Sequence, residues 1–323
     1  VQPAPAQTRD AFEAIREADM RVATTGYRLS TAAAALCDRL EPGTGIQLHT
    51  LAQYPPKSRD AVRAHFGMSG TVAVAGVVPG SPAEQAGLRA DDTIVRFGTI
   101  VPPADTPADA STGPLESLYR QMASLPPAQP IEVVVRRDGG EQQLTIRPQP
   151  ACRTRYELRI ADTFDARANG ELIQLSSKYL EDVDPALFPA VVAHELAHNI
   201  LRHRERLDAA GASFGFASGI GRNVGLFRQT EIEADILSVH ILVRAGYSPS
   251  IAGRFWREVG PRLLEGLIRS RSHPALKDRI ATVEAEAARL TAGEAQAALP
   301  PFFAARGAPL PGEWRSLLVR THR

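Results

Sequence analysis

The ten residues 191–200, Val-Val-Ala-His-Glu-Leu-Ala-His-Asn-Ile, constrain the fold of this chain more than any other stretch. They predict a helix in which His194 and His198 project from one face, about one turn apart. Two imidazoles at this spacing can bind one zinc ion, and Glu195 can reach a metal-bound water and take its proton. The alternative is an amphipathic helix with two solvated histidines and an ordinary glutamate. The uncharged neighbours favour a buried helix that holds the ligands rigidly.

The overall composition is that of a soluble globular protein. The chain has 323 residues, of which 44% are hydrophobic and 23% are charged, enough for two domains or for one domain with an insertion. Its net charge of +1 argues against nucleic acid as a partner. No apolar run approaches the length that a membrane-spanning helix needs, so we expect no transmembrane segment.

The chain has two cysteines, Cys37 and Cys152, too few for a cysteine-rich zinc site. They are either two buried free thiols or one disulfide. The first seven residues are rich in Pro and Ala and lack an initiator Met. We interpret this as a mature exported protein whose signal peptide is absent from the numbering. A disulfide would favour an oxidising compartment such as a bacterial periplasm.

The N-terminal part reads as a helix followed by a strand. Apolar residues recur at helical spacing over residues 10–40, and Pro42-Gly43 ends that pattern. Residues 46–51 alternate as a strand, and Tyr54-Pro55-Pro56 interrupts the chain. We expect residues 1–54 to pack on the catalytic domain and a separate domain to follow at 55–150.

Residues 55–150 read as a β-rich domain. A β-branched run at 71–78 precedes PGSPAEQAGL at 79–88 and DDTIVRF at 91–97, and the strands 131–137 and 142–147 flank an Asp-Gly-Gly turn. With these words the segment resembles a PDZ domain of the bacterial protease type, although Asp91 replaces the usual Gly.

The PDZ resemblance implies capture of an extended C-terminal peptide as an added strand. It also implies a carboxylate-binding loop at Phe66, Gly67 and Met68, before the strand that begins at residue 71. The alternative is a structural β module that packs against the catalytic domain or shields it.

Residues 151–295 read as a second, mainly helical domain with a small sheet, followed by a C-terminal tail at 296–323. Strands are expected at 156–161 and 171–175, the second as an edge where an extended substrate pairs. One helix is expected from about residue 185 to 208. The glycine-rich segment 211–221 is interpreted as a lid, a membrane-contacting loop or a packed connection.

A later helix supplies the best third ligand. Glu231 and Asp235 are four residues apart, so they share a helix face. Glu231 is the candidate third zinc ligand, and Asp235 could accept the outer N–H of a ligating histidine. The alternative is a solvated acidic helix start. His203 is excluded as a ligand, because on a continuous helix it lies about half a rotation from His194; we interpret it as structural or solvated.

Three words occur in one order: His194-Glu195-Leu196-Ala197-His198, Glu231-Ile232-Glu233-Ala234-Asp235, and Ser272-His273-Pro274 with Arg279-Ile280. In these words the chain resembles the gluzincin peptidases of the HtpX, CAAX prenyl endopeptidase and BepA type. The resemblance implies Glu231 as third zinc ligand and places His273 near the metal, as a fourth ligand or gate. The membrane-spanning segments of HtpX and the prenyl endopeptidases have no counterpart here.

These observations predict an α+β protein with one Zn²⁺ per chain that hydrolyses peptide bonds in unfolded or extended polypeptides. Glu195 would be the general base, and Arg279 or Tyr247 would contact substrate or the oxyanion. We expect a periplasmic or otherwise exported protein, in envelope protein quality control, with peripheral membrane contact. The alternatives are a latent or non-catalytic zinc-binding chaperone or adaptor, and, with less support, a small-molecule metallohydrolase.

Overall fold

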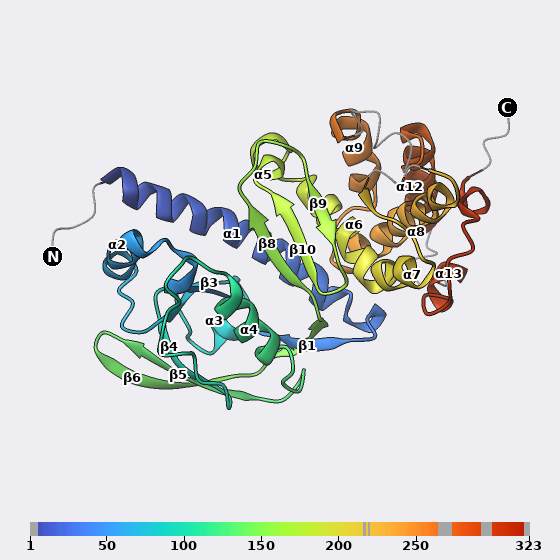
Figure 1. Cartoon of the computed structure of the whole chain (residues 1–323). Coiled ribbons are helices and arrows are strands. Elements are labelled where there is room, and N and C mark those ends of the chain that lie inside the picture. Colours follow the sequence, from blue (N-terminus) through green and yellow to red (C-terminus); the bar gives the residue numbers. More distant parts are fainter. Residues whose placement is uncertain (1–5, 216–217, 219, 264–272, 292–298, 320–323) are drawn as a thin grey trace. The chain divides into compact units, whose positions relative to one another are not determined.

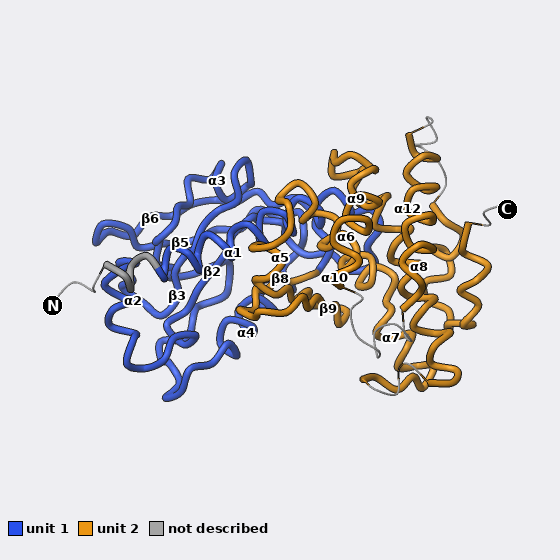
Figure 2. Tube along the Cα trace, turned by 90° about the horizontal axis from the view of Figure 1, so that it is seen from above, with its two compact units in different colours: residues 1–153 blue, residues 154–323 orange. Residues whose placement is uncertain are grey.

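The computed structural model describes residues 6–215, 218, 220–263, 273–291 and 299–319. The fold is mixed α and β, as predicted. The chain divides into two compact units, residues 1–153 and residues 154–323 (Figure 2). Among the described residues, no helix is long and apolar enough to cross a membrane.

An antiparallel five-stranded sheet forms the centre of the first unit (Figure 1). Its order is β2-β3-β4-β5-β6. The strands are β2 (Ile46–Thr50), β3 (Val72–Val77), β4 (Thr93–Phe97), β5 (Ile131–Arg137) and β6 (Gly140–Ile146). Asp138 and Gly139 join the last two, both with positive φ, as the predicted tight hairpin requires.

Short helices connect the strands of the first unit: η1 (Ala34–Leu36), η2 (Leu51–Gln53), η3 (Pro56–Ser58), α2 (Arg59–His65), α3 (Pro82–Gln85) and α4 (Gly113–Met122). Leu115 and Leu118 of α4 join the core with inward-facing strand residues such as Val133. Asp91 has a φ of 69°, a left-handed conformation that Gly adopts more readily than other residues.

The topology corrects the predicted carboxylate loop. Phe66 and Met68 are buried in a small core with Val62, and the strand that follows them, β3, is paired on both sides. An added peptide strand needs an open edge, which β3 does not have. In this sheet β2 is the edge strand on that side.

The N-terminal helix α1 (Ala6–Ala32) belongs to the first unit. It packs on β3, where Gly76 makes room for Met20: a Cβ at Gly76 would lie 2.5 Å from the Met20 sulfur. The N-terminal segment therefore belongs to one compact unit with the sheet, and its predicted packing on the catalytic domain stays a prediction.

A disulfide and a strand pair close the first unit. Cys37 and Cys152 are bonded, with their Cα atoms 5.5 Å apart. The adjacent strands β1 (Leu40–Gly43) and β7 (Gln149–Cys152) pair antiparallel. Of the two states that the sequence left open for these cysteines, the structure has the bridge, and it ties together the two ends of the intervening β domain.

The second unit begins with a three-stranded sheet of order β8-β10-β9. The strand β10 (Leu172–Ser176) lies in the middle, parallel to β8 (Arg155–Arg159) and antiparallel to β9 (Ala166–Ala168). The predicted edge at 171–175 is therefore wrong, because β10 is paired on both sides. The short strand β9, which lies against α6, is an edge of this sheet.

Helices make up most of the second unit: α5 (Lys178–Asp182), α6 (Phe188–Ile200), α7 (His203–Ala209), α8 (Arg222–Arg244), α9 (Ser250–Glu258), α10 (Gly260–Leu263), α12 (Leu276–Thr291), α13 (Pro301–Ala304) and η6 (Trp314–Leu317). Between α7 and α8, Gly211, Gly215 and Gly221 have positive φ. The predicted tail contains the buried residues Leu310 and Trp314, so at least this part packs against the unit.

Candidate metal centre

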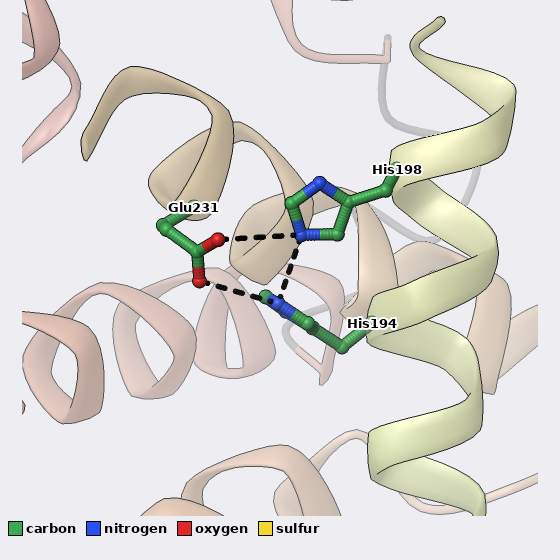
Figure 3. Close-up of side chains that lie close together, drawn as sticks. All are labelled: His194, His198 and Glu231. Carbon is green, nitrogen blue, oxygen red and sulfur yellow. Dashed lines mark hydrogen bonds and ion pairs between the residues drawn. The ribbon is translucent and has the colours of Figure 1, made fainter. Parts of the chain in front are cut away.

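Helix α6 supplies two of the three candidate ligands. Every residue of α6 except His198 is buried, so packing on all sides fixes the backbone that carries the histidines. The Nε2 atoms of His194 and His198 lie 3.1 Å apart. Figure 3 shows both rings extending from one helix toward the carboxylate of Glu231.

Helix α8 supplies Glu231. Its Oε2 lies 3.5 Å from Nε2 of His194 and its Oε1 lies 3.6 Å from Nε2 of His198 (Figure 3). Ligands about 2.0–2.1 Å from a tetrahedral ion are separated by roughly 3.3 Å, close to these values. Two imidazole nitrogens and one carboxylate are also a donor set of zinc sites that keep one position open. The three residues therefore fit a zinc ion.

Glu195 lies next to His194 in sequence and is 8% exposed. Burial raises the pKa of Glu195 to about 7, although the positive charge of His194 acts in the opposite direction. A carboxyl group with such a pKa can both accept and release a proton near neutral pH.

Asp235 lies one turn after Glu231 on α8 and faces the outer nitrogen of His194. Its Oδ1 is 3.1 Å from Nδ1 of His194. Although burial disfavours the imidazolium form, the carboxylates of Asp235 and Glu231 raise the pKa of His194 to about 9. Asp235 therefore lies where a group that orients a ligating histidine has to lie.

Arg279 of α12 contacts the carboxylates of both Asp235 and Glu231. Its Nε and Nη2 donate to Asp235 at 2.7 and 2.8 Å, and Nη2 lies 3.1 Å from Oε2 of Glu231. The guanidinium also stacks on Trp256 of α9, 3.6 Å from the ring centroid. Arg279 is 1% exposed. Nη2 of Arg279 also lies 3.4 Å from Nε2 of His194, and the predicted contact of Arg279 with substrate or oxyanion stays a prediction. No sequence motif marks Trp256.

The predicted position of His203, half a rotation from the ligands on a continuous helix, needs correction. Helix α6 ends at Ile200, Arg202 has a φ of 55°, and α7 starts at His203, so the helix is not continuous. Of the two interpretations of His203, structural or solvated, the structure has the buried, structural one, and Nδ1 of His203 lies 2.9 Å from Nδ1 of His198. Its Nε2 faces Glu233, which sequence reasoning also missed.

Two predicted site residues, His273 and Tyr247, remain to be described. Nε2 of His273 lies 3.8 Å from Oε2 of Glu231. Although burial acts in the opposite direction, the charges of His273 and Arg279 hold the pKa of Glu231 well below its ordinary value. Tyr247 follows the end of α8 at Arg244, and its backbone N–H donates to the carbonyl of Leu242 at 2.9 Å; its contact with substrate or oxyanion stays a prediction.

No protein family and no curated protein matches this sequence. Among solved structures, the HtrA-type protease AlgW with a decapeptide is similar at 25% identity, over 34% of this chain and 30% of its own, with a TM-score of 0.25. The PDZ domain of HtrA3, bound to a phage-derived ligand (FGRWV), is similar at 22% identity, over 35% of this chain and 90% of its own, also with a TM-score of 0.25. Such TM-scores do not assign a fold to the whole chain.

Proposed function

We propose that this chain is a zinc-dependent endopeptidase of the gluzincin type. One observation carries the proposal: the donor atoms of His194, His198 and Glu231 lie within 4.8 Å of one another, with the buried Glu195 beside them. Bound zinc would polarise the scissile carbonyl group and lower the pKa of water. A structural zinc site would not require a buried carboxylate next to its ligands.

The protein's own groups divide the remaining work. Glu195 takes the proton of the attacking water and later delivers it to the amine nitrogen of the leaving peptide. Asp235 orients the ring of His194, and Arg279 holds Asp235 and Glu231 in place by its hydrogen bonds and charge. Each of these groups is positioned before substrate arrives, so little reorganisation accompanies the reaction.

The edge strand β9 is the proposed substrate-binding strand. In its sheet it pairs with β10 on one side, and it lies against the ligand-bearing helix α6. An extended polypeptide can add to such an edge through backbone hydrogen bonds, which favours unfolded or extended substrates.

In the first unit, we propose that a PDZ-like sheet takes part in substrate recognition or regulation. The open edge is β2, beside helix α4. The backbone N–H of Leu48 already donates to the hydroxyl of Tyr119 on α4, at 2.7 Å. A peptide that adds to β2 at this position has to displace the Tyr119 hydroxyl.

The proposed setting is the periplasm or another exported compartment, in protein quality control of the envelope and with peripheral contact to the membrane. The Cys37–Cys152 disulfide supports an oxidising environment, since glutathione and thioredoxin keep most cytosolic thiols reduced.

Two measurements on the purified chain test the proposal. We expect about one zinc ion per chain, and cleavage of casein that a chelator abolishes. Glu195→Gln should retain the zinc and lose the cleavage, whereas the exposed carboxylate variant Glu181→Gln on α5 should behave like wild type. Absence of zinc would refute the metal centre, and full activity of Glu195→Gln would refute the assignment of the base.

The alternative is a latent or non-catalytic zinc-binding chaperone or adaptor. The position of His273 supports latency, because its Nε2 lies 3.8 Å from a carboxylate oxygen of Glu231. If His273 closes the site, His273→Ala should cleave casein faster than wild type. If both proteins bind zinc and neither cleaves, the adaptor function is favoured.

A further inference from the structure

We propose that His203 is a positioning residue for the metal ligand His198, and that Glu233 holds His203 in the tautomer this role requires. The inference rests on the proposed zinc site. It concerns a residue that lies outside the HExxH word and that the helical spacing had excluded as a ligand.

The direction of the hydrogen bonds follows from the chemistry of imidazole. Nε2 of His198 faces His194 and Glu231, so as a ligand it must present a lone pair there. A neutral imidazole with a free Nε2 carries its proton on Nδ1. Nδ1 of His198 lies 2.9 Å from Nδ1 of His203. His203 therefore accepts this bond, and its own proton must be on Nε2.

The proton on Nε2 of His203 has an acceptor. It faces Oε2 of Glu233, at 3.1 Å, and both side chains are buried. The three groups form one chain of hydrogen bonds, in which His198 donates to His203 and His203 donates to the carboxylate. If His203 carried its proton on Nδ1 instead, two N–H groups would face each other, and a bare nitrogen would face the carboxylate. Glu233 therefore selects the tautomer of His203.

Glu233 is itself fixed by two further side chains. Arg206 donates to its Oε2 at 2.8 Å, and Gln229 donates to its Oε1 at 2.6 Å. Both of these residues also hold the C-terminal segment: Arg206 donates to the carbonyl of Ala308, and the amide of Gly312 donates to Gln229. The orientation of Glu233 is consequently determined by packed, hydrogen-bonded neighbours.

The two histidine ligands thus have different supports. His194 faces the carboxylate of Asp235 directly, whereas His198 reaches a carboxylate through a second imidazole. Removing the group behind a ligating histidine typically weakens metal affinity by about 10- to 100-fold. We expect a loss of this size when His203 can no longer accept the hydrogen bond.

The test measures the zinc dissociation constant of the full chain by competition with a chromophoric chelator. His203→Ala should bind zinc about 10- to 100-fold more weakly than wild type. His203→Asn should recover much of the affinity, because its amide oxygen can accept near the former Nδ1 position. The control is His240→Ala, since His240 is equally buried on α8 and pairs with Glu286, away from the ligands. It should lower stability and leave zinc affinity unchanged.

The outcomes separate the two claims. If wild type binds no zinc, the proposed function fails. If wild type binds zinc and His203→Ala binds it equally well, the positioning role is refuted and His203 is merely a packed core residue. If His203→Ala does not fold, the Glu233→Gln variant tests the inference instead. The glutamine amide can donate as well as accept, so it no longer selects one tautomer of His203. Unchanged zinc affinity of folded Glu233→Gln would overturn the inference.

Discussion

Replacing Arg279 by methionine is expected to destabilise the metal-free second unit by about 3–5 kcal/mol, the usual cost of removing one partner from a buried ion pair. Methionine keeps most of the volume and removes the charge. Asp235, which is fully buried, and the nearby Glu231 would then lose one of the two cations that they share, the other being His194. Each close pair is worth roughly 4 kcal/mol at an effective dielectric constant of about 20, so the expected loss is within the available interaction energy.

The chain is suited to this measurement, because its only two tryptophans, Trp256 and Trp314, lie in the second unit. Urea unfolding followed by tryptophan fluorescence therefore reports on residues 154–323. Arg279→Lys is the matched variant: it retains the charge but loses the planar fork that contacts Asp235 and stacks on Trp256. Its destabilisation should be smaller than that of Arg279→Met.

A double-mutant cycle decides whether the carboxylates are the cause. In the Arg279→Met background, Asp235→Asn removes a buried charge that has lost its guanidinium partner, so the two effects should be less than additive by about 0.5–3 kcal/mol. A loss below about 1 kcal/mol for Arg279→Met, or strict additivity with Asp235→Asn, would refute this account of the buried network.

Two further predictions concern the first unit. Burial lowers the pKa of His49 to about 4, from 6.5 in the unfolded chain, so the folded state excludes the proton. The stability contributed by the neutral ring is complete above about pH 6.5 and falls by about 3 kcal/mol as the pH decreases to about 4. Hydrogen exchange of the β2 amides should therefore become faster as the pH falls, after correction for the intrinsic exchange rate. His49→Phe should weaken this dependence of stability on pH. The Cys37→Ala/Cys152→Ala variant opens a loop with a sequence separation of 115 residues, which in the chain-entropy model costs about 4–5 kcal/mol. The same exchange measurement at neutral pH checks this, and unchanged protection would contradict it.

Local spacing was sufficient to predict which residues of the candidate centre share a helix face. His194 and His198 are one turn apart on a helix that the structure contains, and Glu231 and Asp235 are likewise one turn apart on α8. Helical periodicity depends on residues that are close in sequence, so this spacing can be recognised in a single sequence. The convergence of α6 and α8 depends on packing between distant segments, and here the order of the sequence words was the only indication.

Strand edges could not be predicted in the same way. Residues 171–175 and the segment after Met68 both have the composition of strands. In the structure the first corresponds to β10 and the second to β3. Composition does not state which neighbours a strand will have, and each of these two is paired on both sides. The edges, β9 and β2, follow from pairings between segments that periodicity alone does not relate.

The error at His203 has a single local cause, and it can be tested. A continuous helix would carry His203 away from the ligands, but Arg202 adopts a left-handed conformation and starts α7 in a new direction. Val at position 202 should destabilise the second unit by about 1–2 kcal/mol, because a β-branched residue is strained at positive φ. Gly at the same position should not. If the turn places His203 next to His198, Arg202→Val should also weaken zinc binding, whereas Arg202→Gly should not. Equal zinc affinity of the folded Arg202→Val and Arg202→Gly variants would show that the ligand geometry does not depend on the conformation of Arg202.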